Sequence, residues 1–153
     1  MFTTTVMPVR AETISWRRLL VGGAGAAIGA VVANGLIYVA AAALGAMAQT
    51  VVVRPNQPIT LFAVVGTTIS SVVGAKLVLA LLKQVTHRPL TIFHIVAGVV
   101  LALSFATPFT IANAPIAMVV SLDIMHIITA MIVVYMLNWA TRTSLPQMSP
   151  ASR

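Results

Sequence analysis

Long runs of apolar residues, separated by short polar segments, are the dominant pattern in this chain. Four such runs cover residues 19–47, 59–82, 90–111 and 116–140. About 20 consecutive apolar residues cross a bilayer core roughly 30 Å thick, so each run is long enough to span a membrane. Because a backbone in hydrocarbon must satisfy its own hydrogen bonds, the runs should be helices. The pattern therefore predicts an all-α, polytopic transmembrane four-helix bundle with short loops.

The composition agrees with this prediction and excludes other classes of protein. Hydrophobic residues make up 59% of the 153 residues and charged residues only 7%, whereas a soluble domain carries about 25% charged residues. Strands of a membrane β-barrel would be about 10 residues long and alternate in polarity, and the runs show no such alternation. We expect an N-terminal tail over 1–15, a transmembrane domain over 16–142 and a disordered C-terminal tail over 143–153.

The net charge of +7 comes from basic residues at the ends of the apolar runs. One side of the threaded runs carries Arg54 alone. The other side carries Arg10, Arg17, Arg18, Lys83, Arg88, Arg142 and Arg153. Such an excess marks the cytoplasmic side of membrane proteins, so both termini should be cytoplasmic. Nucleic-acid binding needs a basic cluster on a solvated face, and we therefore expect no nucleic-acid partner.

Small residues recur at four-residue spacing on the first three runs. The sets are Gly25, Gly29 and Ala33; Gly66, Ser70 and Gly74; and Gly98, Ala102 and Ala106. Four residues are close to one helical turn, so each set forms a smooth stripe along one face. Such stripes let helix backbones approach closely in lipid. They predict either packing within the bundle or contact with a second copy or a partner membrane protein.

Five polar residues inside the runs predict a buried polar belt. Asp123 and His126 lie three residues apart, hence on one helix face, and ionisable residues at such depth usually face a bundle interior or a cavity. At about 1.5 Å per residue, Asn34 and Ser70 fall near the depth of His126, and Ser104 falls near that of Asp123. Three interpretations stay open: a structural hydrogen-bonded knot, a binding site for a small molecule, lipid or cofactor, and a proton or ion path.

No motif for catalysis or for a metal can be defended in this chain. A zinc site needs three or four clustered ligands, whereas Asp123 and His126 supply two, and cysteine is absent. His94 and His126 differ in depth by about 10 Å, which is too much for two axial ligands of one haem; a pigment on a single histidine stays a minor alternative. We expect no catalytic residues, no metal and no cofactor.

The segment Asn34-Gly35-Leu36-Ile37-Tyr38 and the pair Met125-His126 give the chain a resemblance to a family of short bacterial four-helix membrane proteins of unknown function. The resemblance covers roughly residues 17–140 and implies a four-helix bundle in the bacterial inner membrane. Asn34 and His126 are the features that the chain would share with the family, which supplies no activity.

Our first hypothesis is a non-enzymatic structural or accessory membrane subunit, surrounded by lipid, that packs with itself or a partner. The alternatives are a binder with an intramembrane polar site and a small proton-linked transporter or channel.

Overall fold

The chain forms four long apolar helices and a small hairpin in a computed structural model that describes residues 16–47, 52–54 and 57–142. The predicted tails 1–15 and 143–153 lie outside the described residues. In chain order the elements are α1 (Trp16–Ala43), β1 (Val52–Arg54), β2 (Gln57–Pro58), α2 (Leu61–Val85), α3 (Pro89–Ser104), α4 (Ala106–Phe109) and α5 (Ile116–Arg142).

The helices confirm the predicted class of fold. By length and apolarity, α1, α2, α3 taken with α4, and α5 could each cross a membrane. The strands β1 and β2 pair antiparallel, with Val52 opposite Pro58. They lie in the segment between the first two spans, where the β-branched residues Val51, Val52 and Val53 favour an extended conformation. The chain is therefore a multi-pass membrane protein with four helical spans.

The end of the first helix and the start of the second lie inside the predicted runs. The first helix ends at Ala43, not at residue 47, because Gly45 adopts a positive φ of 73°. The amide of Ala46 donates to the Ala41 carbonyl at 2.8 Å, which closes the helix end in the manner typical of a glycine just beyond it. The second helix begins at Leu61, not at residue 59. Thr60 caps this helix, because its hydroxyl accepts a hydrogen bond from the amide of Ala63.

The third run is interrupted, as its proline predicts. Pro108 has no amide hydrogen to donate to the carbonyl four residues earlier, and its ring crowds that carbonyl. That carbonyl belongs to Ser104, where α3 ends, and the short helix α4 follows. Pro89 occupies the first turn of α3, where its missing amide hydrogen costs nothing. Asn113, with φ of 59°, forms the turn into α5.

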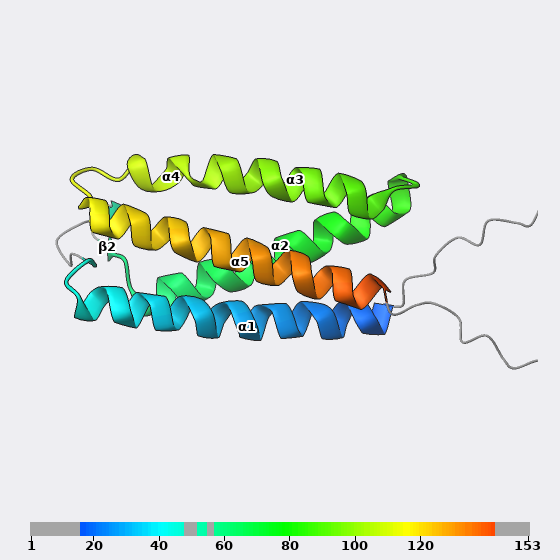
Figure 1. Cartoon of the computed structure of the whole chain (residues 1–153), viewed down its shortest axis with the longest axis horizontal. Helices are drawn as coiled ribbons and strands as arrows, with labels where there is room; N and C mark the ends of the chain where they lie inside the picture. Colours follow the sequence, from blue (N-terminus) through cyan, green and yellow to red (C-terminus); the bar gives the residue numbers. More distant parts are fainter. Residues whose placement is uncertain (1–15, 48–51, 55–56, 143–153) are drawn as a thin grey trace, which may run out of the picture.

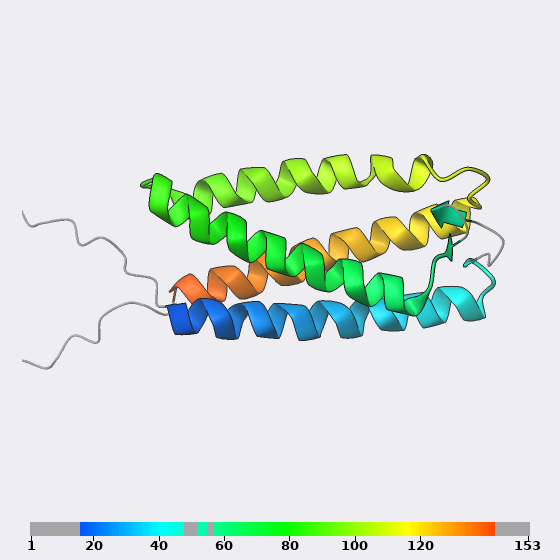
Figure 2. The same ribbon diagram turned by 180° about the vertical axis from the view of Figure 1, so that it is seen from behind.

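The four spans are arranged as one tight pair and two diverging helices. Figure 1 shows α1 and α5 side by side along the bundle, with α3 and α4 on the far side of α5. Figure 2 shows that α2 begins beside α1 and rises to meet α3 at the opposite end. As a result, α2 and α3 diverge toward the end of the bundle that carries β1 and β2, which we call the hairpin end.

Positive charge gathers at the other end of the bundle, which we call the basic end. The start of α1, the end of α5 and the connection between α2 and α3 all lie there (Figure 1). Among the described residues these segments carry Arg17, Arg18, Lys83, Arg88 and Arg142, whereas Arg54 lies at the hairpin end. The predicted segregation of basic residues to one side of the spans is therefore present in three dimensions.

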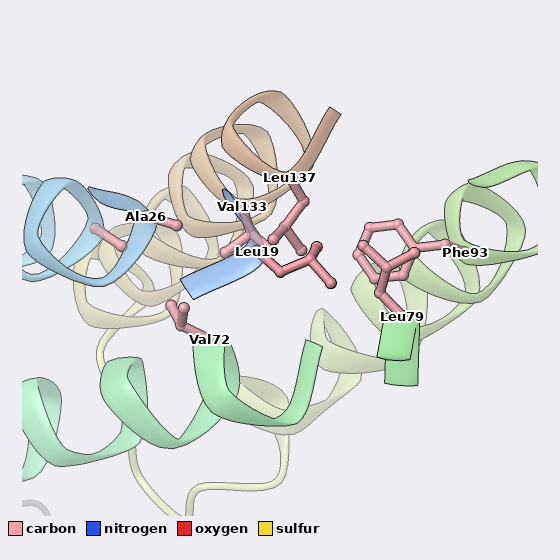
Figure 3. Packing of buried hydrophobic residues seen from close by; sticks show 8 residues of the cluster. Leu19, Ala26, Val72, Leu79, Phe93, Val133 and Leu137 are labelled. Carbon is pink, nitrogen blue, oxygen red and sulfur yellow. The ribbon is translucent and has the colours of Figure 1, made fainter. Parts of the chain in front are cut away.

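The apolar core is divided into two clusters along the bundle axis. In the half near the basic end, residues from all four spans meet, and Figure 3 shows Leu79 and Phe93 directed toward Leu137 and Leu19. The second cluster lies near the hairpin end and contains Ala41, Met47, Val64, Met118 and Met125. Apolar side chains thus fill the core near both ends of the bundle, and the level between the two clusters is left for other side chains.

The small residues of α1 pack against α5 inside the bundle. A Cβ atom added to Gly22 would lie 2.7 Å from Cβ of Ala140 and 3.1 Å from the Met136 carbonyl oxygen. A Cβ atom on Gly25 would overlap the terminal methyl of Met136, and one on Gly29 would lie 3.5 Å from Ile132. Bundle packing therefore accounts for these glycines, as one of the two interpretations of the stripes predicts.

The stripes on α2 and α3 have a different environment. A Cβ atom added to Gly66, Gly74 or Gly98 would meet no described atom within 4 Å. The other small residues of these stripes, Ser70, Ala102 and Ala106, are exposed. Packing within the bundle does not explain these two stripes, so contact with a second copy or a partner stays a prediction for them.

Candidate intramembrane binding site

Asn34 of α1 joins three helices at the level between the two apolar clusters. Its side chain is 4% exposed. Nδ2 donates to Oγ1 of Thr68 on α2 at 2.9 Å and to Oγ1 of Thr129 on α5 at 2.7 Å. Oδ1 of Asn34 is buried and accepts no hydrogen bond from any described residue. The amide is therefore satisfied as a donor and unsatisfied as an acceptor.

The hydrogen bonds of Thr68 support this orientation of the Asn34 amide. The Thr68 hydroxyl donates its hydrogen to the Val64 carbonyl at 2.7 Å. A hydroxyl that has given away its only hydrogen can interact with Asn34 only as an acceptor, so the amide nitrogen must face it. Oδ1 is consequently directed away from the two threonine oxygens.

A cavity of about 450 Å³ lies beside Asn34, in the space where α2 and α3 diverge over α5. It is lined by side chains from within residues 64–78 of α2, 93–104 of α3 and 122–134 of α5. At about 1.5 Å per residue, these stretches make the cavity roughly 20 Å long. Its rim is exposed at Thr67, Ser71, Val78 and Val100. The cavity therefore opens sideways, on the surface that would face lipid.

His126 of α5 lines the same cavity and is half-buried. Its Nδ1 lies 2.7 Å from the carbonyl oxygen of Leu122. Because a carbonyl oxygen can only accept, Nδ1 must carry a hydrogen, and in the neutral ring Nε2 then has a free lone pair. Nε2 makes no hydrogen bond with a described residue, so it offers the cavity an acceptor.

Three of the five predicted belt residues line this one cavity: Asn34, Ser104 and His126. Ser70 does not join them, because it is exposed and donates to the Gly66 carbonyl of its own helix at 2.9 Å. It lies two residues beyond Thr68, which turns it to nearly the opposite side of α2. Counting residues along α2 gives the depth of Ser70 in the bundle, but it does not determine which face of the helix the residue occupies.

Asp123 lies in a separate, smaller cavity of about 210 Å³ near the hairpin end, whose lining includes Pro108, Phe109 and Val119. Its Oδ1 atom is buried and has no hydrogen-bond partner among the described residues. Asp123 and His126 thus line different cavities, although they are three residues apart on α5. The arrangement offers no shared site for the proton or ion path considered from the sequence.

The other histidine inside a helix has a partner of its own. Nε2 of His94 on α3 lies 2.9 Å from Nδ2 of Asn138 on α5, a contact that joins the two helices near the basic end. Within the described parts of the chain, no group of three or more His, Cys, Asp or Glu residues is placed to hold a metal ion.

The two threonines that bind Asn34 were not anticipated from the sequence. Thr129 lies three residues after His126, hence on a neighbouring face of α5, and this spacing was the available signal. Thr68 and Ser70 are both hydroxyl residues at similar depth on α2, and the sequence offers no means of choosing between them. The choice follows from the way α2 is rotated against α1 and α5.

A protein-family profile matches the part of the chain that contains the four spans. The profile of a family of unknown function (DUF6069) matches residues 14–143. The chain belongs to this family. The match includes all the long helices and confirms the resemblance noted in the sequence, but the family has no assigned activity. No curated protein and no solved structure matches the chain.

Proposed function

We propose that the protein is a non-enzymatic membrane protein that binds an apolar small molecule or single-chain lipid within the bilayer. The observation that supports this proposal is the elongated cavity of about 450 Å³ beside Asn34 and His126. Ligand sites are typically concave and mostly apolar, with a few placed polar groups. This cavity has that composition, with valines, alanines and Phe93 along most of its walls.

The position of the opening supports entry from the bilayer. The exposed rim residues lie on α2 and α3, in the middle of two candidate spans. A ligand dissolved in the hydrocarbon phase could therefore reach the cavity without crossing the polar interface. This geometry favours a lipid-soluble ligand over one that enters from water.

The test uses two matched substitutions on α2. Gly74 lines the cavity and Gly66 does not, yet a Cβ atom at either position would meet no described atom within 4 Å. We expect Gly74→Leu to fill part of the cavity and Gly66→Leu to leave it unchanged. The full-length protein in phosphatidylcholine nanodiscs would be irradiated with a hydrocarbon carrying a diazirine, and labelled residues would be mapped by mass spectrometry.

In the unsubstituted protein, cavity residues such as Val96 and Val134 should be labelled well above the lipid-facing background. Gly74→Leu should reduce this labelling severalfold, and Gly66→Leu should not, with the thermal unfolding temperatures of both variants unchanged. Labelling that follows general lipid exposure in all three proteins would contradict the proposal.

A role as an accessory subunit is the second candidate, supported by the outward-facing small residues of α2 and α3. Because the chain has no cysteine, single cysteines can probe helix contacts between copies. We expect Ser70→Cys to form disulfide-linked dimers in oxidised membranes. Leu36→Cys, on the exposed side of α1, is the control. Equal cross-linking at the two positions would remove self-association through α2 as a candidate.

We also propose that the protein resides in a bacterial inner membrane with its basic end, and hence both termini, in the cytoplasm. The charge distribution supports this orientation. A membrane-impermeant maleimide applied to intact cells should label Ala112→Cys at the hairpin end. It should label His87→Cys, in the connection between α2 and α3, only after the cells are permeabilised. The reverse pattern would overturn the proposed orientation.

A further inference from the structure

The hydrogen-bonding groups of the cavity are strongly biased toward acceptors. Thr67 donates to the Ala63 carbonyl at 2.8 Å, Ser71 to the Thr67 carbonyl at 2.8 Å, and Ser104 to the Leu101 carbonyl at 2.7 Å. Thr68 likewise donates to its own helix. Among the described hydroxyls that line the cavity, only Thr129 has a hydrogen for which no acceptor is assigned. These side chains therefore offer a ligand mainly oxygen lone pairs.

One further acceptor is the one that a ligand can satisfy best. Oδ1 of Asn34 has no donor in the described chain, but the atom is itself fully buried, so a ligand in the cavity does not reach it. Nε2 of His126, which lines the cavity, is an acceptor on a ring whose other nitrogen is engaged by the Leu122 carbonyl. A ligand that fills the cavity covers this acceptor, and an acceptor buried without a donor is costly. A ligand that brings an O–H group avoids this cost, whereas a ligand that brings only another acceptor does not.

The apolar part of the cavity is elongated. From the level of Asn34 toward the basic end, its walls are formed by side chains such as Ala75, Val78, Phe93 and Val133. With a length of roughly 20 Å, this part can hold an extended hydrocarbon chain that lies along the bundle axis.

From these observations we propose that the cavity binds a long-chain alcohol, meaning a single hydrocarbon or isoprenoid chain that ends in a hydroxyl group. The hydroxyl donates to Nε2 of His126, and the chain extends toward the basic end. This inference rests on the proposed function and adds the class of ligand to it. Ketones, ethers and carboxylates of the same length lack the required donor and bind more weakly.

The experiment compares ligands that differ at one functional group. The full-length protein in phosphatidylcholine nanodiscs is labelled with a hexadecanol that carries a diazirine in its chain, and the labelled residues are mapped by mass spectrometry. Competitors are 1-hexadecanol, hexadecyl methyl ether and hexadecanoic acid. We expect the alcohol to compete at least about tenfold more effectively than the ether, because only the alcohol supplies a donor to a buried acceptor.

The substitution His126→Phe tests the assigned acceptor, because it keeps a ring in the cavity wall and removes Nε2. It should abolish the preference for alcohol over ether while ether competition is retained. His94→Phe is the matched control, because His94 does not line the cavity, and it should leave the preference unchanged.

The possible outcomes distinguish an error in the proposed class of ligand from an error in the proposed function. Equal competition by alcohol and ether at cavity residues would overturn the alcohol assignment and leave apolar binding in place. A preference that persists undiminished in His126→Phe would overturn the assigned acceptor. If no probe labels cavity residues above background, the proposed function itself is wrong.

Discussion

The contact between α1 and α5 and the divergence between α2 and α3 show two uses of small residues in one bundle. On α1, glycines allow close approach to α5, and even one added methyl group at Gly22 would collide with Ala140. On α2 and α3, small residues recur at the same four-residue spacing, but the glycines among them, Gly66, Gly74 and Gly98, have open space around them. The same sequence pattern therefore marks a closed interface in one region and an open, lipid-accessible surface in the other.

The two regions differ because of the forces that hold helices together inside a bilayer, where the hydrophobic effect does not act between helices. Helices in lipid associate through close packing and a few interhelical hydrogen bonds. The pair α1 and α5 has both, since its glycines are packed and Asn34 donates to Thr129. Between α2 and α3, contact is concentrated near the basic end, where Leu79 and Phe93 meet in the core (Figure 3). The bundle is thus closely packed on one side and open on the other.

The largest effect should come from removing a core side chain. Leu137 of α5 is fully buried in the cluster near the basic end, whereas Leu103 of α3 is 67% exposed. We expect Leu137→Ala to lower the free energy of unfolding by about 2–5 kcal/mol. Leu103→Ala should change it by less than about 0.5 kcal/mol. Thermal and denaturant unfolding in detergent would measure both, and equal losses would contradict the assigned core.

A direct comparison of the two glycine environments should give an intermediate effect. Gly22→Ala places a Cβ atom 2.7 Å from Ala140 and near the backbone of α5, so the helices must move apart. Overpacking of this kind costs about 1–3 kcal/mol. Gly98→Ala makes the same chemical change in open space on α3 and should be neutral or slightly stabilising, because alanine favours the helix. Similar unfolding temperatures for the two variants would show that α1 and α5 are not closely packed.

The smallest effect should come from the hydrogen bonds of Asn34. Thr129→Val keeps the shape of the side chain and removes an acceptor for Nδ2 of Asn34. Interhelical hydrogen bonds in membranes contribute about 0.6 kcal/mol on average, and we expect a loss of that order. Thr67→Val is the matched control, since Thr67 donates only to carbonyls of its own helix. If both variants lose the same stability, Asn34 does not link the helices energetically.

Much of the fold could be predicted because it depends on local properties of the chain. The apolar runs are long enough for four spans, Pro108 ends α3, and Pro89 begins it. The end of α1 was placed too late, although Gly45 is the local signal for it. These features depend on side chains within a few residues of one another, and so the sequence carries them directly.

The candidate site was only partly predictable, because its residues come from four spans. Asn34 and His126 were predicted to lie at similar depth, and both line the larger of the two cavities described above. Thr68 was missed in favour of Ser70, and Asp123 lines a different cavity. Depth follows from counting residues along a helix, but the rotation of each helix about its axis depends on packing against its neighbours.

By itself, therefore, the sequence determined that the chain crosses the membrane four times, with its basic residues on one side, because hydrophobicity and charge act on each segment separately. Only the tertiary structure decided which small residues are packed, which threonines bind Asn34, and where α2 and α3 leave a cavity. Those outcomes depend on the rotation and tilt of whole helices, and many weak contacts between distant residues set these together.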